Sequence, residues 1–298
     1  MRILITGATG FIGRHLVERL APAHEVYALV RRLPTAPNLT VQYICQDLAQ
    51  PLDRQQLPCQ LDAIIHQATV IDTDQVDEAM PFLVNVVATW RLLRYAAEVG
   101  VRTFVHASTG GIYGCHQQPL QESDPPNPLD LYSLTKAQAE LAVQAAPGAF
   151  HKVVLRYFFP YGVGTPNPIP SYVRRAVQGE PIEILASGGP WFNPLHVTDA
   201  IAMTVQALAL DRSVTVNIAG QEVTTFAQIA AMAAQCVGRQ PIFRQIPDEA
   251  AIPYYRANLV AATERMDQLF ARRAWVPLQQ GITELVTHYT NEEATKPV

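Results

Sequence analysis

Short apolar runs alternate along the first half of the chain with longer segments in which apolar residues recur every three or four positions. Such runs are typical of parallel strands, because these strands are covered by helices on both faces. The predicted strands are Ile3–Thr6, Glu25–Val30, Val41–Cys45, Ala63–His66, Thr103–Ala107 and Val153–Tyr157. Their alternation with helical segments indicates βαβ units, and we therefore predict an α/β fold with a doubly wound parallel sheet.

Two predicted helices stand out in this half of the chain. The segment Phe82–Val99 has one continuous apolar face and is followed by Gly100, a residue that favours the end of a helix. A second helix is predicted over Leu131–Ala146.

The texture of the chain changes after Pro160, where prolines become frequent and interrupt regular structure. Later helices are expected from Thr225 and from Ala257, separated by loops. We predict that residues 1–160 form the main domain and that residues 161–298 form mainly a smaller C-terminal substrate-binding lobe, interleaved with the first domain.

A glycine-rich turn lies between the first predicted strand and the first predicted helix. Its sequence is Thr6-Gly7-Ala8-Thr9-Gly10-Phe11-Ile12-Gly13. Gly7 allows a sharp bend, Gly10 lets backbone N–H groups approach a pyrophosphate, and Gly13 lets the new helix pack closely on the sheet. The order of strand, turn and helix predicts a Rossmann-type fold that binds a dinucleotide.

Composition limits the partners that the chain can have. Of its 298 residues 49% are hydrophobic and 16% are charged, and the net charge is −4. This balance provides no basic field for nucleic acid or for an anionic membrane. No apolar run approaches the roughly 18 residues of a membrane span, and strand-like residues begin at Arg2, so we expect a cytoplasmic protein.

The cysteines and histidines show no metal-binding pattern, and no bound metal is predicted. Cys45, Cys59, Cys115 and Cys236 lack the spacing of a metal site, so we expect buried, reduced thiols. His66, His106 and His196 lie in apolar runs, and we expect core histidines whose hydrogen bonds come from the backbone.

Candidate chemistry centres on Tyr132 and Lys136, which are four positions apart in a predicted helix and project from one face. A nearby ammonium and an oxidised nicotinamide ring are expected to lower the pKa of Tyr132, so that its phenolate acts as a general base. Ser108 and Thr109 follow a predicted strand at its carboxyl end, where doubly wound sheets bind ligands. Thr109 either donates a hydrogen bond to a substrate oxygen or, like Ser108, only caps a turn.

Together these motifs resemble the extended short-chain dehydrogenase/reductase family, which includes nucleotide-sugar epimerases, dehydratases and 4-ketoreductases. The resemblance covers nearly the whole chain. It is carried by Gly7, Gly10 and Gly13, by Asp47-Leu48, His66-Gln67-Ala68 and Asn85, by residues 156–162, by His196-Val197-Thr198-Asp199, and by Trp275-Val276-Pro277 with Gly281.

The resemblance implies hydride transfer between nicotinamide C4 and a hydroxyl or keto carbon of a sugar-like or secondary-metabolite substrate. In this mechanism Tyr132 is the acid/base, Thr109 orients the substrate oxygen, and Lys136 binds the ribose. The implied cofactor-binding residues are Gly7, Thr9, Gly10, Phe11, Ile12, Gly13, Arg31, Arg32, Asp47, Leu48, Gln67, Ala68, Asn85, Ser108, Tyr132, Lys136, Tyr157 and Phe159. A homodimer through the helices Phe82–Val99 and Leu131–Ala146 is also implied.

The second predicted strand departs from the pattern of NAD-selective sites. It ends in Val30-Arg31-Arg32, where such sites place an acidic residue that binds both ribose hydroxyls. The arginines can pair with a 2′-phosphate, which favours NADP over NAD unless both are solvated loop charges.

Two other departures concern the reaction and the substrate. Gly110-Gly111 replaces the acidic pair that follows the catalytic Thr in the family's dehydratases, which disfavours dehydration. Aromatic residues at Phe158-Phe159 and Trp191-Phe192 replace the polar groups that hold a diphosphate in nucleotide-sugar enzymes. Either cations such as Arg174, Arg175 or Arg256 supply the charge, or the substrate is less anionic and more apolar.

An epimerase and a ketoreductase both remain compatible with these residues. A rival of another class is a regulatory protein that senses NAD(P) without turnover, because the same fold hosts many functions. The joint presence of Thr109, Tyr132 and Lys136 favours an enzyme, since a sensor has no need of all three.

Overall fold

The computed structural model describes the whole chain except residues 72–76, 115–118, 251–257, 272–274 and 295–298. Contacts within the chain divide it into two compact units, each assembled from three stretches of sequence. The first unit comprises Met1–Ile112, Pro128–Arg156 and Ile201–Val216, and the second comprises Tyr113–Asn127, Tyr157–Ala200 and Asn217–Val298. Both units therefore draw on the early and the late parts of the sequence.

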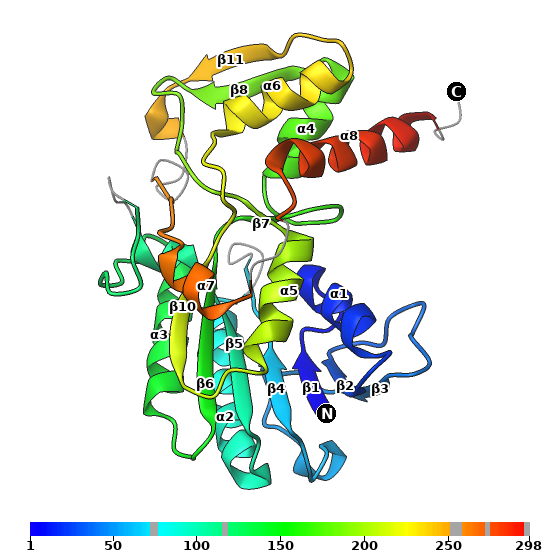
Figure 1. Cartoon of the computed structure of the whole chain (residues 1–298), viewed down its shortest axis with the longest axis vertical. Coiled ribbons are helices and arrows are strands. Elements are labelled where there is room, and N and C mark those ends of the chain that lie inside the picture. The colour runs from blue at the N-terminus through cyan, green and yellow to red at the C-terminus, as the bar shows by residue number, and fades with distance from the viewer. Residues whose placement is uncertain (72–76, 115–118, 251–257, 272–274, 295–298) are drawn as a thin grey trace. The chain divides into compact units, whose positions relative to one another are not determined.

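A seven-stranded sheet with the order β10-β6-β5-β4-β1-β2-β3 organises the first unit (Figure 1). Its strands are β1 (Arg2–Thr6), β2 (Glu25–Val30), β3 (Gln42–Cys45), β4 (Ala63–His66), β5 (Thr103–Thr109), β6 (His151–Tyr157) and β10 (Val214–Ile218). The pairs β1–β2, β1–β4, β2–β3 and β4–β5 are parallel. The predicted Rossmann-type doubly wound sheet is confirmed, and all six predicted strands are present.

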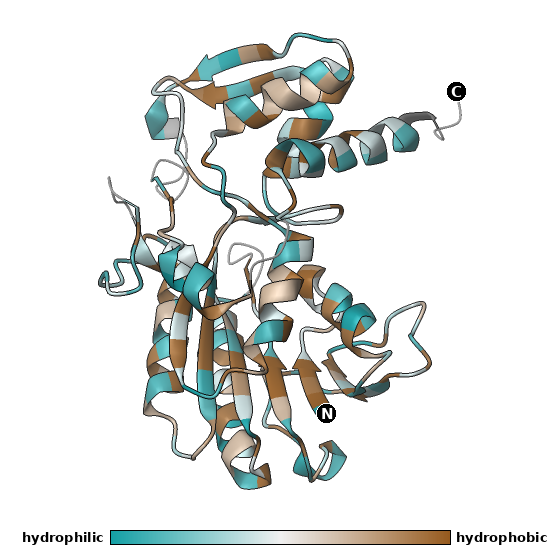
Figure 2. Cartoon of the chain, viewed as in Figure 1, coloured by the Kyte–Doolittle hydropathy of each residue, from teal (hydrophilic) through white to brown (hydrophobic). Residues whose placement is uncertain are grey.

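Helices cover both faces of this sheet. The connecting helices are α1 (Phe11–Leu20) after β1, α2 (Ala88–Val99) after β4 and α3 (Leu131–Ala145) after β5, with a short η1 (Arg54–Gln56) before β4. The connections from β1 to β2 and from β4 to β5 run in opposite directions across the sheet, so right-handed crossovers place α1 opposite α2 and α3. Figure 2 shows the hydrophobic residues concentrated on the strands, and Leu4, Ile64 and Phe104 pack with Leu92 of α2 in the core.

The helix predicted over Phe82–Val99 begins with a widened turn. Residues Phe82–Val87 form the π-helical segment η2, and α2 follows without a break. The helix ends at Gly100, whose φ of +67° is left-handed and favours glycine. Sequence periodicity predicted the helix but missed the π-helical turn, because one widened turn leaves the apolar pattern almost unchanged.

The second unit contains three longer helices and two small parallel sheets. The helices are α4 (Ile169–Gln178), α6 (Phe226–Cys236) and α8 (Leu278–Ala294), and the strand pairs are β7 (Pro160–Tyr161) with β9 (Leu195–His196) and β8 (Pro181–Leu185) with β11 (Ile242–Ile246). Shorter elements are α7 (Glu264–Leu269) and η4 (Asp248–Ala250), while η3 (Gly110–Tyr113) and α5 (Val197–Ala207) each span a boundary between the units. Helix α4 packs against both α6 and α8.

The predicted helix start at Thr225 is confirmed. Helix α6 follows Thr225, whose hydroxyl accepts a hydrogen bond from the backbone of Gln228 in a capping box. Ala257 lies outside the described residues, and the next described helix begins only at Glu264. The intervening backbone is bonded elsewhere, because Leu259 N donates to Trp191 O and Ala262 N donates to Leu120 O.

The expectation of buried thiols is also wrong for the described cysteines. Cys45, Cys59 and Cys236 are exposed, and all three are free thiols. Cys45 ends β3, which lies at an edge of the sheet, so one side of this strand has no neighbouring strand. Cys115 lies outside the described residues. None of the helices in the described part of the chain is long and apolar enough to cross a membrane, and the cytoplasmic location stays a prediction.

Candidate active site

The glycine-rich turn joins β1 to α1 and requires glycine at two positions. Gly7 has a φ of +66°, and a Cβ atom there would lie 2.6 Å from Ala68 N. A Cβ atom on Gly13 would lie 2.1 Å from Gly7 O, so the first turn of α1 packs directly on the bend. Gly10 N donates a 2.9 Å hydrogen bond to Gly7 O. The backbone is therefore held in a tight turn that no larger residue could form.

The start of α1 fits an anionic group such as a dinucleotide pyrophosphate. Its N-cap is Gly10, which provides no side-chain cap for the first N–H groups of the helix. Backbone N–H groups at a helix start attract phosphates through hydrogen bonds and through the helix dipole. Thr9 and Gly10 are exposed, while Phe11 and Ile12 are half-buried in the first helical turn.

The other predicted cofactor residues of this unit lie after strands β2, β3 and β4. Arg31 and Arg32 are exposed and follow β2 directly. Asp47 is exposed, and its Oδ1 accepts a 2.9 Å hydrogen bond from Ala49 N, whereas Leu48 is buried. Gln67 and Ala68 follow β4 and are half-buried. In a sheet of this order β1 and β4 flank the point where the strand order reverses, which is where such folds bind ligands.

Tyr132 and Thr109 come together from two different elements of the first unit. Thr109 is the last residue of β5, and Tyr132 lies in the first turn of α3. Asp130 caps this helix, because its Oδ1 accepts a 2.6 Å hydrogen bond from Ser133 N. The hydroxyls of Thr109 and Thr69 lie near the Tyr132 hydroxyl, and both lower its pKa. Thr109 also accepts a 3.1 Å hydrogen bond from Gly111 N, so it both caps a turn and meets the tyrosine.

The environment of Tyr132 keeps its phenol protonated at neutral pH. Burial raises its pKa to about 12, the negative charge of Asp130 adds to this effect, and the interactions with the Thr109 and Thr69 hydroxyls oppose it. Sequence reasoning expected Lys136 to lower this pKa, but burial is the dominant effect in the structure. Lowering by an oxidised nicotinamide ring stays a prediction.

Lys136 lies one turn after Tyr132 and is buried. Burial lowers its pKa to about 8, and the charge of Glu140 opposes this lowering. Its Nζ lies 3.4 Å from His106 Nε2. Glu140 pairs with Arg156 of β6 at 2.7 Å.

Ser108, a predicted cofactor residue, is buried just before Thr109 and donates its hydroxyl hydrogen to Glu140. The predicted residue is thus part of a buried ionic cluster formed by Ser108, Glu140 and Arg156. Glu140 was missed by the sequence analysis, although its position four residues after Lys136 on the same helix face was a usable signal.

Asn85 connects the widened helical turn η2 to α3. Its Nδ2 donates to Thr135 Oγ1 at 2.9 Å, and its Oδ1 accepts from Thr69 Oγ1 at 2.9 Å and from Val70 N at 2.8 Å. Thr69 also lies near the Tyr132 hydroxyl. Asn85 therefore holds Thr69 in place beside Tyr132, the candidate acid/base. Sequence reasoning found Asn85 and missed Thr69 and Thr135, which have no motif of their own.

The three histidines are buried, as expected. His196 has the expected backbone partner, whereas His66 is bound by side chains. His66 Nδ1 lies 2.6 Å from Thr6 Oγ1, and its Nε2 lies 2.9 Å from Thr89 Oγ1. In the second unit His196 Nε2 lies 3.2 Å from Glu284, and its Nδ1 accepts a hydrogen bond from Thr198 N. Side chains therefore bind both of these rings.

Tyr157 and Phe159, two predicted cofactor residues, belong to the second unit. Both are buried. Phe159 has a φ of +42°, which is uncommon for a bulky residue, and its ring packs on Phe192 with centroids 4.5 Å apart. Their predicted contact with the cofactor stays a prediction.

The arginines that were candidates for a diphosphate have protein partners in this unit. Arg174 lies 3.7 Å from Glu292 and 4.7 Å from the Tyr289 ring centroid. Arg175 donates to Pro181 O at 2.9 Å. Arg256 lies outside the described residues.

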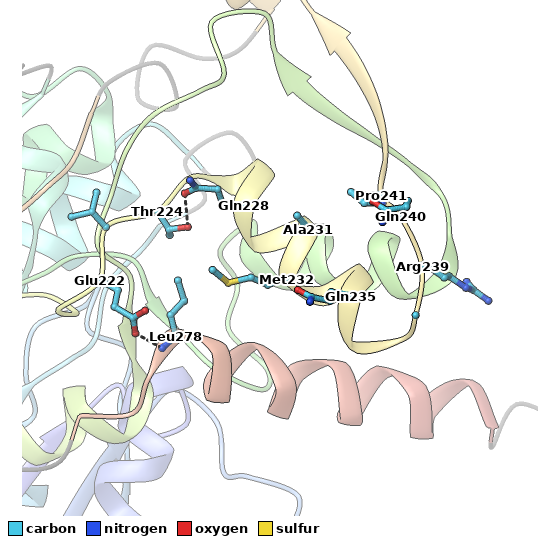
Figure 3. Close-up of a pocket in the computed structure, with 12 residues that line it drawn as sticks. Glu222, Thr224, Gln228, Ala231, Met232, Gln235, Arg239, Gln240, Pro241 and Leu278 are labelled. Atoms are coloured by element: carbon cyan, nitrogen blue, oxygen red, sulfur yellow. Dashed lines mark hydrogen bonds between the residues drawn. The ribbon is translucent and has the colours of Figure 1, made fainter.

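A pocket of about 730 Å³ opens beside α6 in the second unit (Figure 3). Glu222 accepts a 2.7 Å hydrogen bond from Leu278 N at one end, and Thr224 bonds to Gln228 at 3.1 Å. The residues that line it include none of the predicted catalytic or cofactor-binding residues, and we place no function there.

Comparison with known proteins places this geometry in a family. Residues 3–219 match the model of the NAD dependent epimerase/dehydratase family. YtcB of Bacillus subtilis, described as an uncharacterized UDP-glucose epimerase, is 26% identical in an alignment that covers 98% of each chain.

Solved structures agree with this match. MoeE5 in complex with UDP-glucuronic acid and NAD has a TM-score of 0.82 at 27% identity, covering 98% of this chain and 100% of MoeE5. UDP-glucuronic acid 4-epimerase from Bacillus cereus has a TM-score of 0.87 at 23% identity, with coverage of 98% and 100%, and it supports the fold alone. These matches favour the enzymatic interpretation over an NAD(P)-sensing regulator. The chain belongs to the NAD-dependent epimerase/dehydratase family, a group of extended short-chain dehydrogenases/reductases.

Proposed function

We propose that the protein is an NAD-dependent epimerase that inverts a carbinol carbon of a nucleotide-linked sugar. The observation that carries this proposal is that Tyr132, at the start of α3, lies beside Thr109 at the end of β5, with buried Lys136 one helical turn further along α3. A tyrosine that can exchange a proton, a second hydroxyl that can orient an oxygen and a buried cation are the groups that reversible oxidation of an alcohol needs.

NAD supplies the hydride acceptor and donor when it is bound. The turn at Gly7, Gly10 and Gly13 would hold its pyrophosphate at the start of α1, and Lys136 would bind its ribose. Tyr132 removes the proton of the substrate hydroxyl as the carbon is oxidised, and it returns a proton when the carbon is reduced from the other side. Thr109 donates a hydrogen bond to the reacting oxygen, and the Lys136 ammonium favours the ionised form of Tyr132.

We propose NAD as the cofactor, in place of the NADP favoured by the Arg31-Arg32 pair. The family match is to NAD-dependent enzymes, and MoeE5 was solved with NAD. Both arginines are exposed after β2, which agrees with solvated loop charges.

Epimerisation rather than dehydration is proposed because of the residues that follow Thr109. Gly110 and Gly111 lie in the 3₁₀ turn η3 and provide no carboxylate for the elimination of water. The matched family includes dehydratases by its description, so assays for both reactions belong in the test. A ketoreductase would exchange its dinucleotide with solution, whereas an epimerase would retain it.

The substrate proposal is a UDP-linked hexose or hexuronic acid. Its support is the description of YtcB as a UDP-glucose epimerase and the UDP-glucuronic acid in the MoeE5 complex. Arg174 and Arg175 already bind protein groups, which favours a less anionic substrate as the alternative. A panel of UDP-linked substrates distinguishes the two.

The first experiment is to release and identify the dinucleotide that co-purifies with the protein. Wild-type protein is then incubated with UDP-glucose, UDP-galactose and the two corresponding UDP-uronic acids, and the products are resolved by NMR. We expect retained NAD and formation of the 4-epimer of one of these substrates. An empty protein that prefers NADPH and reduces ketones would contradict the proposal, as would a keto-deoxy product.

We also propose that the protein forms a homodimer through η2, α2 and α3. These elements pack against one another in the first unit. They carry the exposed apolar side chains Phe82 (36%), Trp90 (37%), Leu134 (38%) and Leu141 (63%). Burial of this group of side chains against a second copy would remove apolar surface from water.

A further inference from the structure

His106 occupies an unusual position for a polar residue. It is fully buried in the middle of β5, and its neighbours Val105 and Ala107 are apolar. It pairs in register with His66 of β4, and the two rings have centroids 5.4 Å apart. Two imidazoles therefore lie side by side in the interior of the sheet.

The two histidines differ in their hydrogen bonds. Both nitrogens of His66 have hydroxyl partners, from Thr6 and Thr89. His106 Nε2 lies 3.4 Å from Lys136 Nζ, whereas its Nδ1 has no hydrogen-bond partner among the described residues. A buried polar atom without a partner destabilises a fold. The contact with Lys136 is therefore the interaction that explains why a polar residue is buried at this position.

The protonation state of His106 follows from its surroundings. Burial lowers its pKa well below the ordinary value, and the charge of Lys136 lowers it further. The ring is therefore neutral at physiological pH. Because an ammonium only donates hydrogen bonds, Nε2 must be the unprotonated nitrogen and Nδ1 must carry the hydrogen.

We propose that His106 is a positioning residue, whose neutral Nε2 accepts a hydrogen bond from the Lys136 ammonium and holds that group in place and in its charged form. The inference rests on the proposed function, in which Lys136 binds the dinucleotide ribose and acts on Tyr132. His106 deepens that proposal by explaining how a buried lysine keeps its charge where it is needed.

The charges of the groups around Lys136 determine how much the contact with His106 stabilises its ammonium form. His106 of β5 and His66 of β4 are neutral, because burial also lowers the pKa of His66 to about 3. Tyr132 and Glu140 lie one turn before and one turn after Lys136 on α3, and Glu140 is itself bound to Arg156 of β6. The pKa of Lys136 is about 8, so the loss of one favourable contact would leave much of it uncharged near neutral pH.

The test is a direct titration of Lys136 in the ligand-free protein. The lysines of the chain are Lys136, Lys152 and Lys296, so NMR of lysine-labelled protein resolves them, and K136M identifies the signal of Lys136. We expect His106→Leu to lower the pKa of Lys136 by about one unit or more, because the apolar replacement accepts no hydrogen bond. His106→Gln, which keeps an acceptor, is expected to restore most of the wild-type value.

Thr103→Val is the matched control. Thr103 is buried in the same strand, and its hydroxyl has no hydrogen-bond partner among the described residues. This variant is expected to leave the Lys136 titration unchanged. His106→Phe is a second apolar replacement, with the same expected result, in case His106→Leu does not fold. A folded apolar variant in which Lys136 titrates as in wild type would overturn the inference.

Equilibrium binding of NAD provides a second readout. We expect His106→Leu to bind NAD at least about fivefold more weakly than wild type at pH 8 and nearly as tightly at pH 6, where Lys136 is largely protonated in both proteins. An equal loss of affinity at both pH values would indicate a structural effect and contradict the proposal. If K136M binds NAD and turns over substrate like wild type, the proposed role of Lys136 fails, while the titration still decides the role of His106.

Discussion

At the residue scale the candidate site depends on opposing effects at half-buried Tyr132 and at buried Lys136. Burial holds the pKa of Tyr132 at about 12 and that of Lys136 at about 8, so burial alone favours the uncharged form of both. Interactions with the Thr109 and Thr69 hydroxyls oppose this effect at the tyrosine, and Glu140 opposes it at the lysine. The proposed chemistry therefore needs every one of these polar partners.

Tyr132→Phe tests the acid/base assignment. The variant keeps the ring and removes the hydroxyl, so turnover is expected to fall by about 10²- to 10⁴-fold. NAD affinity, measured by calorimetry, is expected to stay within about twofold of wild type, because the backbone turn at Gly7 is untouched. Tyr43→Phe is the control, since the Tyr43 hydroxyl accepts a hydrogen bond only from a loop N–H in the described structure. Near-normal turnover in Tyr132→Phe would refute the assignment.

The spacing of Tyr132 and Lys136 was readable in the sequence because both lie on one helix. Thr69 and Glu140 show why the rest of the site was harder to find. Thr69 reaches Tyr132 only because β4 and α3 are brought together by folding. Glu140 contacts Ser108 and Arg156 from two other elements, and no local motif records those contacts.

At the scale of elements the turn between β1 and α1 combines a folding requirement with the proposed binding of the dinucleotide. Gly13 is needed because the helix lies against the backbone of the bend, where a Cβ atom would come within 2.1 Å of Gly7 O. A Cβ atom on Gly10 would meet Gly7 O only at 3.1 Å, which is tight but adjustable. The two glycines therefore have separable functions.

Gly13→Ala and Gly10→Ala test this separation. Gly13→Ala is expected to destabilise the fold by about 1–3 kcal/mol, because the backbone must move to accept the methyl group. Gly10→Ala is expected to change stability less and to weaken NAD binding, because it obstructs the approach to the helix start. Urea unfolding and calorimetry measure the two effects. Equal stability of both variants would contradict the close packing at Gly13.

The buried pair of Glu140 and Arg156 connects α3 to β6. Their side chains are only 4% and 5% exposed. Glu140→Ala removes the carboxylate that faces a buried guanidinium, and the expected destabilisation is about 3–5 kcal/mol.

Glu98→Ala is the matched control for this prediction. Glu98 pairs with Arg54 at 2.9 Å, but the two side chains are 54% and 38% exposed. Water screens such a pair, so the expected loss is at most about 1 kcal/mol. Urea unfolding of the two variants gives the comparison, and equal losses would show that burial does not set the strength of the Glu140–Arg156 pair.

At the scale of the whole molecule the chain forms two units, and the segments of the two units alternate along the sequence. The segment Tyr113–Asn127 belongs to the second unit although it follows β5 of the first, and Ile201–Val216 belongs to the first unit although it lies late in the chain. The sequence-based division near residue 160 stays a prediction about domains, whereas the contacts define interleaved units. Local composition, such as the prolines after Pro160, does not indicate which unit a later segment of the chain will join.

Leu141→Glu tests the proposed dimer. Leu141 is 63% exposed on α3, so a charge there should not affect folding but should prevent an apolar contact with a second copy. The wild type is expected to have the mass of a dimer in light scattering, and the variant that of a monomer. Leu39→Glu is the control, because Leu39 is 94% exposed in a loop outside α2 and α3. A wild-type monomer would refute the dimer.

Sequence by itself determined the alternating strands and helices, the dinucleotide turn and the Tyr132–Lys136 pair, because each depends on residues that are close along the chain. Tertiary structure decided the π-helical turn at Phe82–Val87, the exposure of the cysteines and the partners of the buried polar groups. His106 shows the physical reason. Its residue type and apolar neighbours predict a core histidine, but only the packing of β5 against α3 places its ring on Lys136.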